Sequence, residues 1–149
     1  MRIAVATDHA GFPLKRVILD ELAKLGIDAL DLGVDSPASV DFPDYAARVG
    51  RALQQQQAER GILICGSGVG MAIAANKMAG VRACVTHDTY SAHQGVEHDS
   101  MNVMCLGSRV IGEEVARELV RAFAHAHFQQ EERFVRRLEK INRLEAENE

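Results

Sequence analysis

The sequence predicts an α/β fold: a three-layer α/β/α sandwich built on a doubly wound, five-stranded parallel sheet of the Rossmann-like kind. Short apolar runs alternate with segments of helical periodicity, and the connections between them are short. Strands that alternate with helices in this way form parallel sheets with both faces covered. Neither a repeat nor a linker interrupts the pattern, so residues 1–149 are expected to form a single domain.

The first three elements follow from their periodicity. Residues 2–7 (RIAVAT) form a short apolar run and are predicted to be a strand. Residues 12–26 are predicted to be a helix, because Pro13 stands in the first turn and Gly26 provides a stop. Its apolar residues that fall on one face are Leu14, Val17, Ile18, Leu22 and Leu25. Residues 27–33 alternate between apolar and polar side chains, which is typical of a strand.

The middle of the chain continues the alternation. Residues 34–43 are rich in turn formers and are expected to be a loop, and residues 44–57 have helical periodicity. Residues 61–65 (GILIC) form an uninterrupted apolar run, which predicts a buried strand. Small residues at helical spacing over residues 69–78 predict the helix that follows.

Two further strands and two further helices complete the predicted sheet. The strands are residues 81–87 and 102–107, and the helices are residues 88–97 and 112–128. In such folds ligands bind at the carboxyl ends of the strands. Candidate site residues are therefore expected directly after each apolar run.

The last segment differs from the rest. Residues 130–149 are strongly charged and carry only a thin apolar stripe of Phe134, Leu138 and Ile141. A helix this polar buries little surface on its own core. We therefore expect an extra C-terminal helix, over about residues 129–147, that reaches a partner subunit.

Composition excludes several classes of function. The chain is 47% hydrophobic with a net charge of −4 and no Trp, so neither nucleic acid nor an anionic membrane is an expected partner. No apolar run approaches the roughly 20 residues that span a bilayer. The three cysteines form no CxxC pair, which argues against disulfides and zinc and favours a cytoplasmic protein.

The glycine loop after the third strand is the most informative stretch. Gly66, Gly68 and Gly70 stand at alternate positions between a predicted strand and a predicted helix. Met71 takes the place where a dinucleotide fingerprint needs its third glycine, so a nucleotide-binding module remains only as an alternative. Successive backbone amides at a helix N-terminus, including that of Val69, form an anion site. The competing interpretation is a turn that merely requires glycine.

Cys65 ends the strand that precedes this loop. A helix N-terminus beside it favours the thiolate, which acts as a nucleophile or a base. Cys84 and Cys105 stand inside predicted apolar strands and are expected to be small core residues.

Other candidates have a structural alternative each. Asp8 and His9 end the first strand, where they either contact a ligand or cap the next helix. His98 is a candidate acid or base; its five-residue spacing from His93 does not suit a metal site on one helix face, and no metal is expected. Arg109 follows the last strand.

Arg133 and Arg137 are spaced to lie on one face of the last helix. Such a pair forms either a phosphate clamp or an ordinary solvated face.

These motifs together resemble the ribose-5-phosphate isomerase B family, which includes the galactose-6-phosphate isomerase subunits. The resemblance covers essentially the whole chain. The motifs that carry it, in order, are DHAG, GILICGSGVGMAIAANK, VRACV, EHDSMNV, LGSRVIG and RFVRRLEKI. It implies an aldose–ketose isomerase without metal or organic cofactor, and a homodimer or a tetramer of paired dimers with active sites between subunits.

The resemblance also implies roles for individual residues. Cys65 matches the catalytic base, Ser67 a hydroxyl that shuttles protons between sugar oxygens, and His98 the ring-opening acid. The matches to sugar and phosphate contacts are Asp8, His9, Asp99, Arg109, Arg133 and Arg137, the last two expected to reach the neighbouring subunit's site. The amides from Gly66 to Gly70 are expected to stabilise a cis-enediolate.

Three departures from the family pattern concern the substrate. Asp99 stands where the family commonly has Asn, Phe134 where a histidine often follows the arginine, and Ser67 where threonine is common. Ribose 5-phosphate is the first expectation. The alternatives are erythrulose 4-phosphate with erythrose 4-phosphate, which has no ring to open, and allose or galactose 6-phosphate. A subunit that needs a paralogue is disfavoured, because Cys65 and all three arginines are present.

Overall fold

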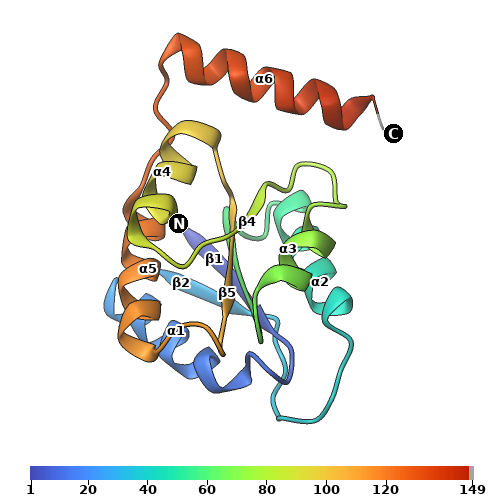
Figure 1. The fold of residues 1–149 in the computed structure, drawn as a ribbon, viewed down its shortest axis with the longest axis vertical. Coiled ribbons are helices and arrows are strands. Elements are labelled where there is room, and N and C mark those ends of the chain that lie inside the picture. Colours follow the sequence, from blue (N-terminus) through green and yellow to red (C-terminus); the bar gives the residue numbers. More distant parts are fainter. Residues whose placement is uncertain (148–149) are drawn as a thin grey trace.

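The computed structural model describes residues 1–147 and has three layers, with a parallel sheet in the middle (Figure 1). The strands are β1 (Arg2–Thr7), β2 (Asp28–Asp31), β3 (Arg60–Cys65), β4 (Ala83–Val85) and β5 (Val103–Gly107). Their order in the sheet is β2-β1-β3-β5-β4, and all four neighbouring pairs are parallel. The predicted five-stranded, doubly wound sheet is confirmed.

Helices cover both faces of the sheet. The covering helices are α1 (Phe12–Lys24), α2 (Phe42–Gln54), α3 (Val69–Ala75), α4 (Thr89–Asp99) and α5 (Glu113–His125), and a sixth helix, α6 (Glu132–Ala146), follows them. Apolar side chains of α1, α4 and α5 pack on one face, and those of α2 and α3 pack on the other. In β3, Ile62 and Ile64 face the first layer whereas Leu63 and Cys65 face the second. Alternation along a doubly covered strand therefore gives the continuous apolar run seen in the sequence.

Most element boundaries differ by one to three residues from the sequence-based prediction, and those of α2, β4 and β2 have a physical reason. Helix α2 begins at Phe42, two residues earlier than predicted, because Pro43 fits the first turn of a helix and does not need the loop. Strand β4 has only three residues, since it lies at the edge of the sheet and has one neighbour. Strand β2, at the other edge, is also shorter than predicted.

Chain order and sheet order diverge between β1 and β3. From β1 the chain moves outward to β2 and then returns across β1 to β3. At such a switch point the loops leave the neighbouring strands in opposite directions, which opens a crevice at their carboxyl ends. The residues after β1 and β3 are Asp8 and Gly66, so the fold brings the first two predicted site segments together.

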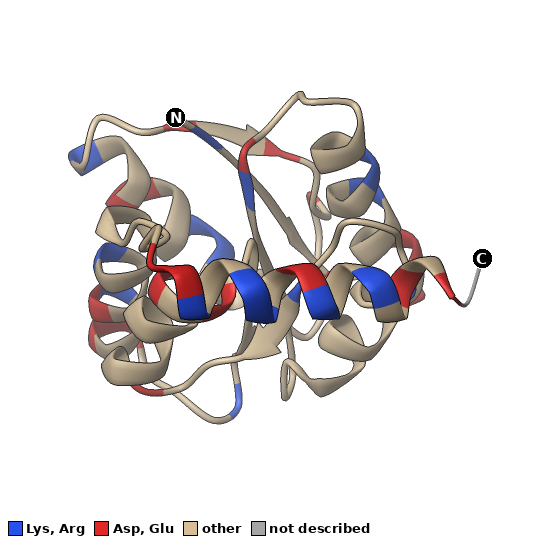
Figure 2. Cartoon of the chain, turned by 90° about the horizontal axis from the view of Figure 1, so that it is seen from above, with Lys and Arg blue, Asp and Glu red and all other residues tan. Residues whose placement is uncertain are grey.

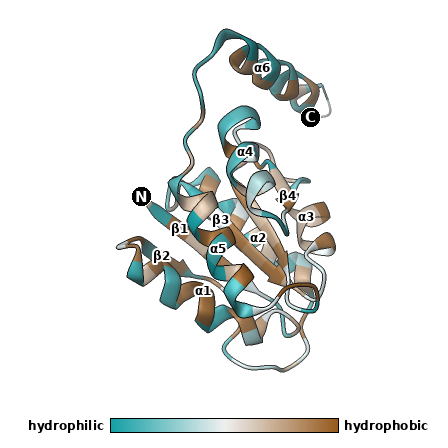
Figure 3. Ribbon diagram, turned by 60° about the vertical axis from the view of Figure 1, so that its left-hand side comes forward, coloured by the Kyte–Doolittle hydropathy of each residue, from teal (hydrophilic) through white to brown (hydrophobic). Residues whose placement is uncertain are grey.

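Helix α6 lies apart from the three layers. It crosses over one end of the sheet, from the side of α4 and α5 toward that of α2 and α3, with acidic and basic residues alternating along it (Figure 2). In Figure 3, α6 shows both teal and brown bands, so it has a hydrophilic and a hydrophobic side. Phe134 is its one buried residue among those described, and Ile141 is 42% exposed. The expectation that this helix buries little surface on its own chain is confirmed.

The remaining cysteines divide between core and surface. Cys105 is fully buried in β5, and burial raises the pKa of its thiol, as expected of a core residue. The same prediction is wrong for Cys84, which is exposed because β4 is an edge strand. Within residues 1–147, none of the helices has both the length and the apolar composition needed to traverse a bilayer.

Candidate active site

Hydrogen bonds tie together the three loops that follow β1, β3 and β5. The amide of Asp8 donates to the carbonyl of Ile64 (3.2 Å), which extends the β1–β3 ladder by one residue. The amide of Ser108 donates to the carbonyl of Cys65 (2.9 Å), and its hydroxyl donates to the carbonyl of Ala10 (2.6 Å). The loops therefore form one rigid rim at the carboxyl edge of the sheet.

A cavity of about 410 Å³ opens inside this rim. Its lining residues are Asp8, His9, Ala10, Phe42, Cys65, Gly66, Ser67, Gly70, Arg109 and Val110. Three of the four stretches of sequence that share this site were predicted from their position after a strand, and the fourth, at Phe42, was not. Gly68 and Val69 complete the loop between Ser67 and Gly70.

Cys65 is 6% exposed and is the last residue of β3, directly before the glycine loop. Its Sγ accepts a hydrogen bond from the amide of Gly68 at 3.1 Å. Gly68 has a φ of +80°, and a Cβ there would lie 3.0 Å from the carbonyl carbon of Leu106. A side chain would be strained at this position, so glycine is the residue that lets the backbone present its amide to the sulfur.

The loop uses part of its own anion-binding capacity. The amide of Gly68 donates to Cys65, and the amide of Val69 donates to Ser67 Oγ at 3.2 Å. The amide of Gly70 lies in the first turn of α3, where a helix offers it no acceptor. Gly70 lines the cavity together with Gly66, which makes the amides of these residues candidate donors to an anion there.

Asp8 and His9 each accept a backbone amide at the rim of the cavity, whereas α1 begins at Gly11 without a side-chain cap. Asp8 is 5% exposed, and its Oδ1 accepts the amide of Gly11 at 2.9 Å, at the start of α1. The Nδ1 of His9 accepts the amide of Val40 at 3.2 Å, so the ring proton of neutral His9 resides on Nε2. Both residues line the cavity as well as holding local structure.

Sequence reasoning missed the apolar wall of the cavity. Phe42 packs so closely on the glycine loop that a Cβ on Gly70 would lie 2.9 Å from its ring. Val110 lies on the same cavity and is 57% exposed. The one available signal for Phe42 was an aromatic residue next to Pro43 in a segment otherwise rich in polar residues.

Met71, by contrast, is a core residue of α3 and is fully buried. The position where a dinucleotide fingerprint has its third glycine is thus filled by a large side chain. This finding removes the structural basis of the nucleotide-binding alternative.

The remaining predicted site residues lie at the opposite edge of the sheet. His98 and Asp99 end α4, which runs antiparallel to the strands and therefore finishes where β5 begins. Arg133 and Arg137 are exposed on α6, which crosses this same edge (Figure 1). The single chain therefore does not bring these four residues to Cys65.

His98 and α6 form a local unit. The His98 and Phe134 rings are stacked, with centroids 4.2 Å apart and planes 13° from parallel. The Arg133 guanidinium lies 4.6 Å from the centroid of the Phe134 ring. The chain before α6 is also anchored, because the amide of Gln129 donates to the carbonyl of Glu97 at 2.8 Å.

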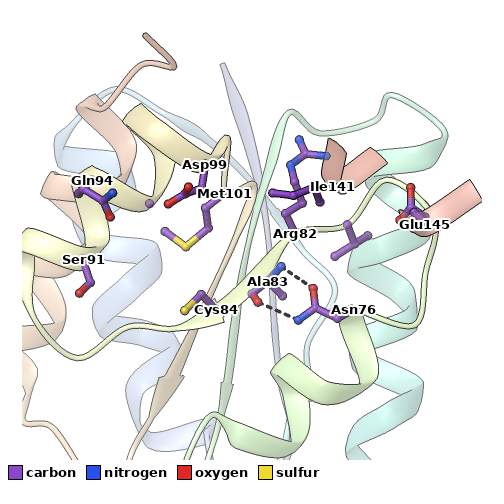
Figure 4. A pocket seen from close by; sticks show the side chains of 12 residues that line it. Asn76, Arg82, Ala83, Cys84, Ser91, Gln94, Asp99, Met101, Ile141 and Glu145 are labelled. Carbon is purple, nitrogen blue, oxygen red and sulfur yellow. Dashed lines mark hydrogen bonds between the residues drawn. The ribbon is translucent and has the colours of Figure 1, made fainter. Parts of the chain in front are cut away.

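A second cavity of about 530 Å³ lies beside this unit (Figure 4). Asp99, Gln94, Met101 and Cys84 border it on one side and Ile141 of α6 on the other. Arg82 also borders it, and the guanidinium is held by the carbonyl of Ser100 at 2.7 Å. The wall is thus largely apolar with charged groups at its edge.

Comparison with known proteins shows the family to which the chain belongs. A sequence model described as Ribose/Galactose Isomerase matches residues 3–141. The chain belongs to the ribose/galactose isomerase family.

Within this family, the chain is 43% identical over 128 residues to ribose-5-phosphate isomerase B of Escherichia coli (strain K12), with 86% of each chain covered. It is 39% identical over 130 residues to the D-erythrulose-4-phosphate isomerase of Pectobacterium atrosepticum, with 87% of this chain and 86% of that one covered. A solved structure of Clostridium thermocellum ribose-5-phosphate isomerase B superimposes over all of both chains, with a TM-score of 0.96 and 40% identity.

Proposed function

We propose that this chain interconverts ribose 5-phosphate and ribulose 5-phosphate, with Cys65 as the base that moves the proton. The observation that carries the proposal is the position of Cys65. Its sulfur lies at the head of the glycine loop, is hydrogen-bonded by Gly68, and shares a cavity with Ser67 and Arg109. The names and close similarity of the family members support the same substrate class.

The reaction needs one base and one oxyanion site. The Cys65 thiolate takes the proton from C2 of the open-chain aldose, and the electron pair of that C–H bond forms the C1=C2 double bond. The carbonyl electrons move onto O1, which gives a cis-enediolate. The thiol then returns the proton to C1, while Ser67 moves a proton between O1 and O2. No group besides the protein and the substrate gains or loses electrons.

The amides of the loop from Gly66 to Gly70 that no side chain uses are proposed to donate to the charge that develops during this step. An oxyanion donor of this kind contributes about 2.7–4 kcal/mol to the transition state. Because the rim is held by hydrogen bonds from Asp8 and Ser108, the donor needs no rearrangement when the charge appears.

We further propose that a second copy of the chain completes each site. His98, Asp99, Arg133 and Arg137 have the residue types that a phosphate and a sugar ring require, yet they lie at the edge opposite Cys65. In a two-fold dimer that joins the carboxyl edge of one copy to α6 of the other, the residues around Cys65 of each copy lie beside these four residues of the other copy. The dimer therefore has two complete sites. The exposed apolar residues near the first cavity, Val69 (50%) and Ile73 (60%), supply a surface for such a dimer.

A four-carbon substrate is the second candidate. Asp99 and Phe134 depart from the family pattern on the residues expected to contact the sugar and open its ring. Phe134 covers the His98 ring, which makes this part of the site more apolar. One close relative is named a D-erythrulose-4-phosphate isomerase.

A substrate panel tests the proposal. Purified protein is assayed with ribose 5-phosphate, erythrose 4-phosphate, allose 6-phosphate and galactose 6-phosphate, and kcat/KM is compared. The highest value is expected for ribose 5-phosphate. A higher kcat/KM for erythrose 4-phosphate would show that the isomerase acts on a four-carbon substrate instead. No turnover of any of the four sugar phosphates would overturn the proposed function.

A further inference from the structure

Gln94 lies one helical turn before His98 on α4 and contacts its ring. The Nε2 of Gln94 is 3.0 Å from the Nδ1 of His98. A side-chain amide nitrogen can only donate, so Nδ1 must accept. A neutral imidazole carries one ring proton, which this contact assigns to Nε2.

The plane of the His98 ring is constrained as well. Phe134, which is 2% exposed, stacks on it at 4.2 Å and 13°. A rotation of the imidazole that tilts its plane would break the stack, and a half-turn about its bond to Cβ, which keeps the plane, would break the Gln94 contact. The ring is therefore fixed in direction by α6 and in proton position by α4.

We propose that Gln94 is a positioning residue that holds His98 as the Nε2–H tautomer, a hydrogen-bond donor aimed at the sugar ring oxygen. This inference rests on the proposed function for its use, and on the Gln94–Nδ1 contact for its geometry. Gln94 also borders the second cavity, on the same side as Asp99 (Figure 4). It belongs to the wall against which the neighbouring copy is proposed to pack.

The donor has a defined task with a cyclic pentose phosphate. Ring opening breaks the bond between C1 and the ring oxygen, forms the C1=O1 carbonyl, and transfers the O1 proton to the former ring oxygen. The Nε2–H of His98 stabilises the negative charge on that oxygen until the proton arrives. Ribulose 5-phosphate has no ring, because its O5 is phosphorylated, so proton exchange at its C1 does not need this donor.

Two substitutions test the tautomer directly. In ¹⁵N-histidine-labelled protein at alkaline pH, the ring nitrogens of wild-type His98 are expected to show the Nε2–H form. Gln94→Met keeps the length of the side chain without a donor, and both tautomers are expected. Gln94→Glu places a carboxylate that only accepts at Nδ1, which should shift the proton to Nδ1. An unchanged spectrum in both variants would overturn the inference.

Kinetic measurements then distinguish a positioning role of Gln94 from a purely structural role. Gln94→Met is expected to lower kcat with ribose 5-phosphate about tenfold, with KM unchanged. Deuterium exchange at C1 of ribulose 5-phosphate should stay within twofold of wild type. Equal loss of both activities would indicate a structural role and contradict the inference.

His93→Gln is the matched control. His93 is also on α4 and makes the corresponding i,i+4 contact with Glu97 at 3.0 Å, away from His98. Its substitution should change neither the His98 spectrum nor either rate. If wild-type protein turns over no sugar phosphate, the proposed function fails, and the His98 spectrum still decides whether Gln94 sets the tautomer.

Discussion

Cys65 and Cys105 lie on neighbouring strands of the sheet, but in different surroundings. Cys105 is a thiol in the middle of a strand, where burial raises the pKa and keeps it neutral. Cys65 stands two residues beyond the position that pairs with Cys105, at the end of β3, where the next amides of the chain turn back toward it. The proposed role of Cys65 as a base therefore depends on its place at the strand terminus, beside the glycine loop.

The first prediction concerns this residue. Cys65→Ala removes the proposed base, and kcat for ribose 5-phosphate is expected to fall about 10²–10⁴-fold, the usual contribution of a general base. Binding of the substrate, followed by calorimetry, should persist because Arg109 and the loop amides remain. Cys105→Ala serves as the control, with kcat close to wild type. Turnover by Cys65→Ala at the wild-type rate would exclude this role.

The second prediction concerns stability. Glu21 is buried between α1 and α5, and hydrogen bonds from Arg121 (2.6 Å) and then Arg117 (3.2 Å) hold the pKa of its carboxyl below the ordinary value. A carboxyl with a depressed folded-state pKa stabilises the fold above its unfolded-state pKa, and this stabilisation is lost as the pH falls through the folded-state pKa. Glu21→Gln should therefore lower Tm at pH 7, with the difference narrowing toward acidic pH.

Thermal unfolding of Glu21→Gln and Glu114→Gln across pH 7 to pH 3.5 checks this. Glu114 also pairs with Arg117, but its side chain is 86% exposed, so its substitution should have little effect at any pH. A Tm difference for Glu21→Gln that is the same at both ends of the range would contradict the assignment.

At the scale of elements, the sequence predicts whether a segment is a helix or a strand better than it predicts where that segment begins and ends. Each predicted strand and helix within residues 1–147 exists, because alternating apolar runs and one-sided helices report directly on burial. The lengths of β2 and β4 could not be predicted, since their position at the edges of the sheet is set by chain order in three dimensions. Cys84 was misplaced for the same reason.

The candidate site follows the same division. The segments after β1, β3 and β5 could be placed together because parallel strands share a carboxyl edge. Phe42 could not, since it enters the cavity from the start of α2, which no motif connects to the loop. The separation of His98 from Cys65 is also invisible in sequence, because it depends on the direction of α4 relative to the sheet.

Helix α6 carries the third prediction. Ile141 is 42% exposed and lines the second cavity, so a dimer partner is proposed to cover it. Ile141→Asp would bury a carboxylate in that interface, and the dimer is expected to dissociate at micromolar concentration while circular dichroism stays unchanged. Light scattering after size exclusion measures the mass. Asn142→Asp, the next residue and also exposed, should retain the wild-type mass. A dimer that survives Ile141→Asp would place the interface elsewhere.

At the scale of the molecule, the residues proposed to act in this aldose–ketose isomerase lie at two ends of the sheet. The carboxyl edge carries the proposed base and oxyanion donor, and the opposite edge carries His98 and the arginines of α6. The hydrogen-bonded rim and the His98–Phe134 stack are each formed within one chain. The proposed dimer would therefore join two half-sites that are each already formed within one chain, with no rearrangement of either.

Subunit mixing tests this central claim most directly. Cys65→Ala and Arg137→Ala homodimers should each be nearly inactive. A mixed dimer has one site with both substitutions and one site with neither, so it should recover about half of the activity of wild-type dimer per molecule. Recovery is measured with ribose 5-phosphate after exchange of differently tagged subunits and isolation of the mixed species. Isolated mixed dimers that remain as inactive as the parents would show that Cys65 and Arg137 do not act across the subunit boundary.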